Sequence, residues 1–201
     1  DESIEPETAD QKTMGMSCLF QVRETDSPKK FTPPSWAYSY PTDADLPFRE
    51  HDLSSNFWWI ELGGDGDAIH DTDRYRDELY KSAYGVWDHI KNHGDHGAEN
   101  FQLEWVGMLP GKRESRRYVG KTTVTQNDVR AEGRFEDVVG YAGWTMDDHF
   151  PAGMNHKTSY PTVYHAAPSP WGIPFRALCS ENVENLLFAG RNISVTHAAL
   201  S

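Results

Sequence analysis

A short basic run, Lys112-Arg-Glu-Ser-Arg-Arg117, places four cations and one acid within six residues. The guanidinium group of arginine is a planar fork of donors that suits carboxylates and phosphates. No other basic run occurs in this acidic chain, which favours a binding role over the alternative of a solvated loop. We therefore predict that Arg113, Arg116 and Arg117 hold an anionic group of a substrate, and that Glu114 orients one of them.

A histidine beside two carboxylates occurs in the stretch Asp147-Asp-His149. Neighbouring carboxylates tune the pKa of a histidine, and such a ring is typical of a general base. His149 is the first candidate for this catalytic role, and His165 is the second. A structural or surface histidine is an equally good interpretation of each.

Three further histidines, His89, His93 and His96, have the spacing H-x3-H-x2-H. On a continuous helix, neutral imidazoles at these positions would share a face and bind zinc or nickel. Gly94 and Gly97 are expected to break the helix here, however, and histidines near the last carbonyls of a helix suit its dipole. We therefore predict a solvated helix end and no metal site, with a metal-dependent hydrolase as an open alternative.

The C-terminal stretch from Asn185 to Ala199 is expected to form an apolar strand, a glycine turn and the start of a helix. Free N–H groups at the start of a helix suit a pyrophosphate or another anion. An ordinary buried strand and turn is the alternative. The candidate cofactor-binding residues are Gly190, Arg191, Asn192, Ser194, Thr196 and His197.

Three blocks of this sequence resemble FAD-dependent oxidoreductases of the xanthan-lyase-like type. These blocks are ENVENLLFAGRNISVTHAAL at 181–200, LPGKRESRRYVG at 109–120 and WGIPFRAL at 171–178. They occur in the order in which the family has them, and the resemblance spans about residues 13–201. It implies that the cofactor is FAD and that residues 190–197 lie near its ribityl chain and pyrophosphate.

The resemblance also implies the reaction, which is hydride transfer between an organic substrate and FAD. His149 or His165 would accept the proton of a substrate hydroxyl, the basic run would bind substrate or stabilise charge on the reduced flavin, and His197 would position backbone or flavin. The dinucleotide-binding pattern GxGxxG of the family is absent from this sequence. We therefore expect an internal part of a longer enzyme, inactive and without FAD by itself, whose partners are the missing flanking segments and a small-molecule substrate.

Aromatic residues alternate in a proline-rich loop at 24–55, where Trp36, Tyr38 and Tyr40 share one face. Sugars stack their C–H faces on such rings, so the substrate is expected to be carbohydrate-like, with Trp36 as a contact. A non-catalytic carbohydrate-binding module is the alternative function.

The surrounding pattern predicts an α+β fold, with a β-sheet, one long helix and several short ones. Apolar residues at helical spacing predict the long helix over 73–92. Strands are expected at 17–22, 56–62, 137–144, 175–179 and 185–190. No linker divides the chain cleanly, so we expect one substrate (cap) domain over 1–184, and 185–201 as the start of the C-terminal part of the FAD-binding domain.

Composition limits the partners of this chain. It has 201 residues, 19 Lys plus Arg and 31 Asp plus Glu, and a formal net charge of −12. This charge disfavours nucleic acid and anionic membranes, because affinity for phosphate backbones depends on basic residues. No apolar run is long enough to span a membrane, and no signal peptide is visible, so we expect a soluble protein and assign no compartment. The two cysteines, Cys18 and Cys179, lack metal or redox spacing, and both two thiols and a single disulfide remain open.

Overall fold

The computed structural model describes residues 12–200, which fold as two compact units. Among these residues, unit 1 comprises 12–13, 114–149 and 162–200, and unit 2 comprises 14–113 and 150–161. The division therefore falls within the basic run, between Arg113 and Glu114, rather than at 184/185. The assignment of residues 1–184 and 185–201 to a cap and a FAD-binding domain stays a prediction. None of the described helices combines the length and the apolarity that a membrane span requires.

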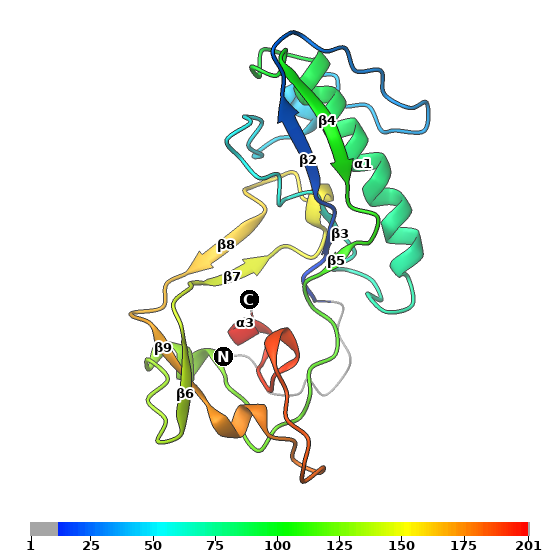
Figure 1. Ribbon diagram of the computed structural model, residues 1–201. Coiled ribbons are helices and arrows are strands. Elements are labelled where there is room, and N and C mark those ends of the chain that lie inside the picture. The colour runs from blue at the N-terminus through cyan, green and yellow to red at the C-terminus, as the bar shows by residue number, and fades with distance from the viewer. Residues whose placement is uncertain (1–11, 201) are drawn as a thin grey trace. The chain divides into compact units, whose positions relative to one another are not determined.

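Unit 2 consists of one long helix, α1 (Thr72–Asn92), and two small antiparallel sheets (Figure 1). One sheet has the order β3-β1-β5, and the other pairs β2 with β4, which lie alongside α1. Two 3-10 helices, η1 (Asp43–Asp45) and η2 (Gly153–Asn155), complete the unit. The strands are β1 (Met16–Ser17), β2 (Phe20–Glu24), β3 (Glu61–Leu62), β4 (Phe101–Val106) and β5 (Gly111–Lys112).

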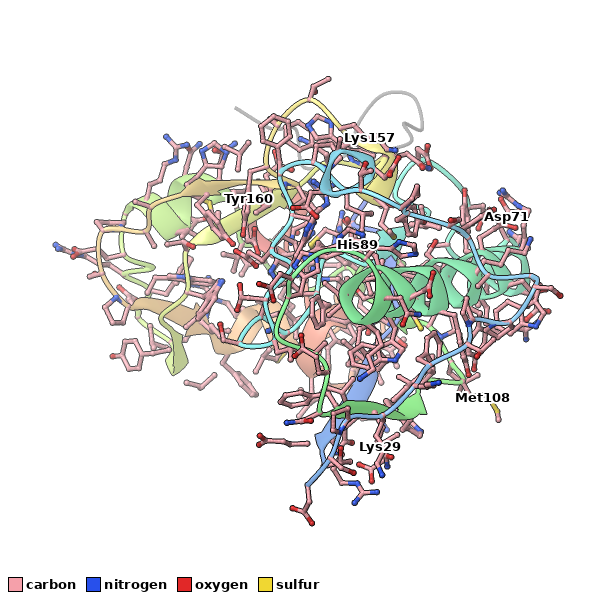
Figure 2. The ribbon with its side chains drawn as sticks, turned by 90° about the horizontal axis from the view of Figure 1, so that it is seen from above. Lys29, Asp71, His89, Met108, Lys157 and Tyr160 are labelled. Carbon is pink, nitrogen blue, oxygen red and sulfur yellow. The ribbon has the colours of Figure 1, made fainter. Side chains whose placement is uncertain are left out.

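The predicted long helix is confirmed, and its apolar stripe forms the core of unit 2. Leu79, Ala83, Val86 and Ile90 are buried together with Trp87, and they pack against β1, β3 and their neighbours. Burial of one apolar face supplies most of the stability of such a helix. Figure 2 shows Asp71 at the start of α1 and His89 near its end. A left-handed glycine, Gly94 at φ +81°, follows the helix, as the sequence predicts.

Unit 1 consists of two antiparallel strand pairs and several short helices around a second core. Here β6 (Val138–Ala142) pairs with β9 (Trp171–Pro174), and β7 (Met146–His149) pairs with β8 (Thr162–His165). The helix α2 (Gln126–Arg130) starts with a capping box, in which Thr125 and Asp128 exchange hydrogen bonds. The remaining helices are η3 (Phe175–Leu178), η4 (Gly190–Asn192) and α3 (His197–Leu200). The core comprises Val124, Val129, Met146, Trp171, Ala177, Val195 and Ala199.

The α+β content is confirmed, but several predicted strands are wrong. Residues 175–178 form the 3-10 helix η3 instead of a strand. The stretch 185–190 forms no strand and makes only an isolated bridge between Cys179 and Leu187, and Leu187 is exposed. Of the predicted strand 56–62, only Glu61–Leu62 pairs. Apolar composition alone cannot distinguish a paired strand from a buried or exposed loop, because pairing depends on distant partners.

We predict that Gly85→Ala destabilises the protein, although alanine is the better helix former by about 1 kcal/mol. The proline-rich loop crosses α1 at this position, where the Tyr38 N–H donates to the Lys81 carbonyl at 3.1 Å. A Cβ atom at Gly85 would overlap the carbonyl oxygen of Tyr38 and lie 2.9 Å from its carbonyl carbon. Urea unfolding should show a loss of about 1–3 kcal/mol.

The matched control is Asp77→Ala, at an exposed position of the same helix, which should change stability by less than about 0.5 kcal/mol. A Gly85→Ala protein that is as stable as the wild type, or more stable, would show that helix propensity outweighs the close approach.

Candidate flavin-contacting site

Residues 114–117 of the basic run and the C-terminal segment 190–197 lie against each other in unit 1. Arg191 donates from Nη1 to the Ser115 hydroxyl at 2.9 Å, and the Asn192 side-chain amide donates to the Arg116 carbonyl at 2.7 Å. The Tyr118 N–H donates to the Asn192 carbonyl at 3.0 Å. Two stretches that are about 75 residues apart in sequence therefore form one surface, and its arginines Arg116 and Arg191 are exposed.

The acid of the basic run is the buried centre of this arrangement. Glu114 is 1% exposed, and its carboxylate accepts hydrogen bonds from Arg117 and from His197 Nδ1, the latter at 2.8 Å. A buried carboxylate is costly unless it is paired and hydrogen-bonded. Glu114 thus joins Arg117 of the basic run to the histidine of the C-terminal segment.

His197 extends this network to Asp148. Its Nε2 lies 3.5 Å from Asp148 Oδ1, and the other oxygen of Asp148 pairs with Lys12 Nζ at 3.0 Å. Burial by itself lowers the pKa of His197, but the hydrogen bonds to Asp148 and Glu114 outweigh it and raise the pKa to about 9. The hydrogen bond from His197 holds the pKa of Asp148 at about 2. The ring is therefore an imidazolium at neutral pH, which suits a fixed positive charge and not a proton acceptor.

The other candidate cofactor residues have different environments. Gly190 has φ +67°, and its missing Cβ would meet open space. The Ser194 hydroxyl is buried and lies 3.0 Å from that of Thr123. The Thr196 hydroxyl is also buried and has no hydrogen-bond partner within the described part of the chain. A buried hydroxyl without a partner, a glycine with open space at its Cβ position and exposed arginines are the kinds of group that could hold a polyphosphate or ribityl chain.

The remaining binding candidates belong to unit 2. Arg113 pairs with the buried Glu61 at 3.2 Å, while the N–H of Gly15 donates to the same carboxylate at 2.7 Å. Trp36 is half exposed and makes an edge-to-face contact with Tyr84 of α1, with ring centroids 5.0 Å apart. The predicted platform of alternating rings does not form, because Tyr40 packs against the core.

The two candidate bases differ in exposure. His149 is 2% exposed, and its Nε2 lies 3.1 Å from Asp147 Oδ2. The other oxygen of Asp147 accepts a hydrogen bond from the Thr162 hydroxyl. His165 is exposed and stands opposite Met146 in the β7–β8 pair. A carboxylate therefore orients His149, whereas solvent reaches His165.

The solvated helix end predicted for His89, His93 and His96 is wrong in one respect. The helix does end at Asn92, and His93 pairs with Asp88 at 3.2 Å. His89, however, is fully buried. The sequence also does not single out Asp148, Asp43 or His51 as partners of the histidines that they face, because no spacing signal joins residues that far apart.

A comparison with protein families matches residues 4–201 to a model described as FAD dependent oxidoreductase. The chain belongs to the FAD-dependent oxidoreductase family. Oxidoreductase is thus its general functional class, and FAD is the cofactor of the full-length enzymes of this family. The narrower xanthan-lyase-like resemblance stays a prediction. No curated protein and no solved structure matches the chain at the significance required.

We predict that the charge on His197 makes stability fall at alkaline pH. The folded pKa, about 9, lies above the ordinary value of 6.5. The contribution is therefore fully present below about pH 6.5 and is lost as the pH rises through about 9. Urea unfolding across this window should show a loss of about 1–3 kcal/mol that is missing in His197→Gln.

The control is His165→Gln, which removes an exposed histidine of the same unit and should keep the wild-type pH profile. Identical profiles for the wild type and His197→Gln would mean that the network does not hold the charged ring.

Proposed function

We propose that the surface formed by residues 114–117 and 190–197 contacts FAD in an enzyme that oxidises an organic substrate by hydride transfer. The observation that supports the proposal is the set of hydrogen bonds between residues 114–117 of the basic run and the C-terminal segment in unit 1. The same two stretches carry the family resemblance. A structural loop would need neither the exposed arginines nor a buried cation behind them.

The cations of the described residues support an anionic ligand. Arg117, His197 and Lys12 are cations that pair with the acids Glu114 and Asp148. Arg116 and Arg191 are exposed and add two positive charges to this surface in a chain of net charge −12. Preorganised cations of this kind stabilise negative charge where water is excluded. They suit the pyrophosphate of FAD and the negative charge of a reduced flavin.

When bound, FAD supplies the redox chemistry by accepting a hydride, and the protein supplies orientation and proton transfer. His149 stays our first candidate for the group that takes the proton of the substrate hydroxyl. Asp147 Oδ2 lies 3.1 Å from its Nε2 and orients the ring. His165 is the second candidate, because its ring is accessible. The raised pKa of His197 keeps its ring protonated at neutral pH, so we do not propose His197 as a third candidate base.

The substrate that we propose is carbohydrate-like, on the basis of a surface cavity in unit 2. This cavity of about 440 Å³ is lined by Trp36, Asp77, Tyr80, Lys81 and Tyr84. Its aromatic rings could stack on a sugar, and its carboxylate and ammonium group could form hydrogen bonds with the hydroxyl groups of the sugar. Trp36 is thus a substrate contact in our proposal, although its neighbours are helix residues and not Tyr38 and Tyr40.

We predict that Arg191→Gln weakens FAD binding in the flavin-loaded enzyme that contains this chain. A charge-assisted hydrogen bond contributes about 1.5–3 kcal/mol, so the Kd for FAD should rise about tenfold to a hundredfold. Flavin fluorescence during titration of the apoenzyme measures this Kd. The change should shrink at high salt, because screening weakens interactions between exposed charges.

The matched control is Arg134→Gln, which removes an exposed arginine of the same unit that pairs with Glu132. It should leave the affinity for FAD unchanged. Equal affinities for the wild type and both variants would remove the flavin-contacting role of segment 190–197.

A carbohydrate-binding module remains a second candidate function, and the Trp36 cavity favours it. We predict that Trp36→Ala weakens binding of a soluble oligosaccharide by about tenfold or more, since stacking on an aromatic ring would be lost. Isothermal titration calorimetry measures the change. The control is Trp105→Ala, which removes a tryptophan of similar exposure on β4. A sugar affinity that does not depend on Trp36 would contradict both the module and the proposed substrate contact.

A further inference from the structure

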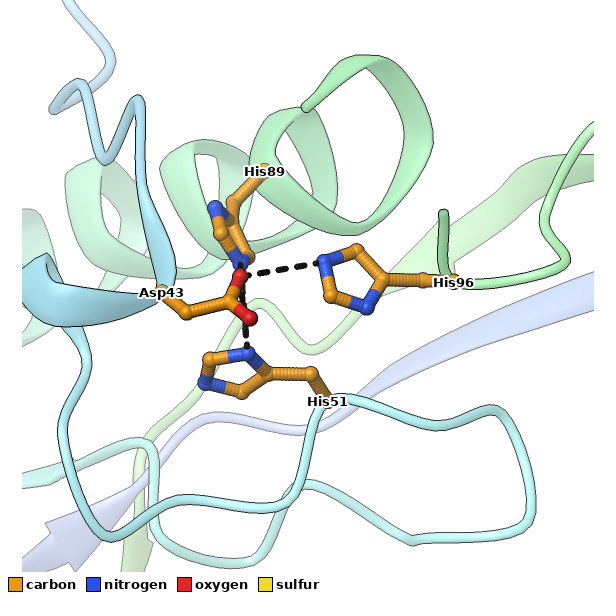
Figure 3. Close-up of side chains that lie close together, drawn as sticks. All are labelled: Asp43, His51, His89 and His96. Carbon is orange, nitrogen blue, oxygen red and sulfur yellow. Dashed lines mark hydrogen bonds and ion pairs between the residues drawn. The ribbon is translucent and has the colours of Figure 1, made fainter. Parts of the chain in front are cut away.

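Four potential metal ligands from separate parts of unit 2 converge on one point (Figure 3). Asp43 lies in η1, His51 in the loop that follows it, His89 in α1, and His96 in the loop after α1. One ligand atom from each side chain lies within 4.8 Å of every other. The group is separate from the surface proposed to contact flavin, which belongs to unit 1.

Four of the six distances between these atoms are close to those of a tetrahedral metal site. Asp43 Oδ1 lies 3.5 Å from His51 Nδ1, 3.3 Å from His89 Nε2 and 3.5 Å from His96 Nε2. His89 Nε2 and His51 Nδ1 are 3.3 Å apart. Bonds of about 2.0–2.1 Å from zinc to nitrogen or oxygen place tetrahedral ligands about 3.4 Å from one another. Most N–H···O hydrogen bonds are shorter, at about 2.7–3.2 Å, so the contacts fit a shared ion better than hydrogen bonds.

The tautomers of two rings point to the same conclusion. The carbonyl of Tyr40 lies 2.7 Å from His89 Nδ1, and that of Leu46 lies 3.1 Å from His51 Nε2. Carbonyls only accept, so these two nitrogens carry the hydrogens. His89 Nε2 and His51 Nδ1 are then the nitrogens that face each other, 3.3 Å apart, and in the neutral rings their lone pairs can bind one shared cation. Backbone carbonyls commonly hold the far nitrogen of metal-bound histidines in this way.

A third observation is independent of the first two rings. The Nε2 atom of His96 is buried and has no hydrogen-bond partner within the described residues, although it is aimed into the cluster. Buried polar nitrogens are almost always satisfied. A bound cation would satisfy this one.

We propose that Asp43, His51, His89 and His96 bind one divalent transition-metal ion, of which zinc is the best fit. Three imidazoles and a carboxylate are ligands of intermediate softness, which suit zinc, nickel and copper and not magnesium or calcium. Four protein ligands complete a tetrahedral shell, so the ion is structural and not catalytic.

The position of the site indicates what the ion does. It fastens the proline-rich loop to the C-terminal end of α1. Tyr40 and Leu46, whose carbonyls orient two of the ligands, also line a cavity of about 360 Å³ together with Asp45. The ion would therefore hold part of the lining of this cavity, to which Tyr75 and Glu78 of α1 also contribute.

The test uses the chain without a histidine tag, stripped with a chelator and reloaded with zinc chloride alone. We expect one zinc per chain by elemental analysis, tight binding in competition with a chromophoric chelator, and a rise in Tm on loading. Cobalt(II) in place of zinc should give the intense visible absorption of a tetrahedral site. The variant Asp43→Asn alters a carboxylate whose side chain is 70% exposed, so it should fold and yet bind zinc at least about a hundredfold more weakly.

A second variant, His51→Gln, should show the same loss. The matched control is His93→Gln, which removes the neighbouring histidine that pairs with Asp88, and it should bind zinc as the wild type does. Three results would each overturn the proposal: no stoichiometric zinc in the wild type, unchanged affinity in Asp43→Asn and His51→Gln, or the weak visible absorption of octahedral cobalt.

Discussion

The buried carboxylate of Glu114 is the constraint on which the candidate flavin site depends. A carboxylate that is 1% exposed has lost nearly all its water, and only paired donors offset the cost of several kcal/mol. Its donors are Arg117, three residues along the chain, and His197, which is 83 residues away. The second contact determines where the C-terminal segment lies. Removing Glu114 would leave two cations facing each other, so the loop and the segment depend on the same side chain.

The other end of the basic run repeats this arrangement in unit 2. Glu61 is buried on β3, and it accepts hydrogen bonds from Arg113 and from the backbone of Gly15. The chain thus passes from one unit to the other between Arg113 and Glu114, with an ion pair on each side. The basic run resembles a single binding motif in the sequence, but its residues are divided between two units, each with its own core. Arg116 is the one arginine of the run whose side chain is exposed, and it takes part in neither of these two ion pairs.

Sequence reasoning was most successful where the physical cause is local. The helix α1 follows from apolar residues three and four positions apart, and α2 follows from the capping box of Thr125 and Asp128. The packing of a close neighbour against Gly85 was also predictable, since a mid-helix glycine is otherwise unfavourable. In contrast, the apolar stretch 185–190 was expected to be a strand and is a largely exposed loop. Its local pattern is compatible with both, and the decision depends on partners that the pattern does not contain.

The candidate sites, like the helices and strands, could be predicted from the sequence only where their cause is local. The basic run and the segment 190–197 were identified as separate candidates, and their contact could be learned only from the fold. The histidine cluster is the stronger case, because the spacing of His89, His93 and His96 draws attention to His93, which is not part of the cluster. His93 follows the end of the helix and pairs with Asp88, while His51 and Asp43 come from a loop with no periodicity. The cluster is identified by its chemistry and not by its spacing: the ring nitrogens of His51 and His89 face each other, and the buried Nε2 of His96 has no hydrogen-bond partner among the described residues. Glu114 in unit 1 is paired with Arg117 and His197, whereas the four members of the cluster include no arginine or lysine, and this difference is the physical argument for an ion.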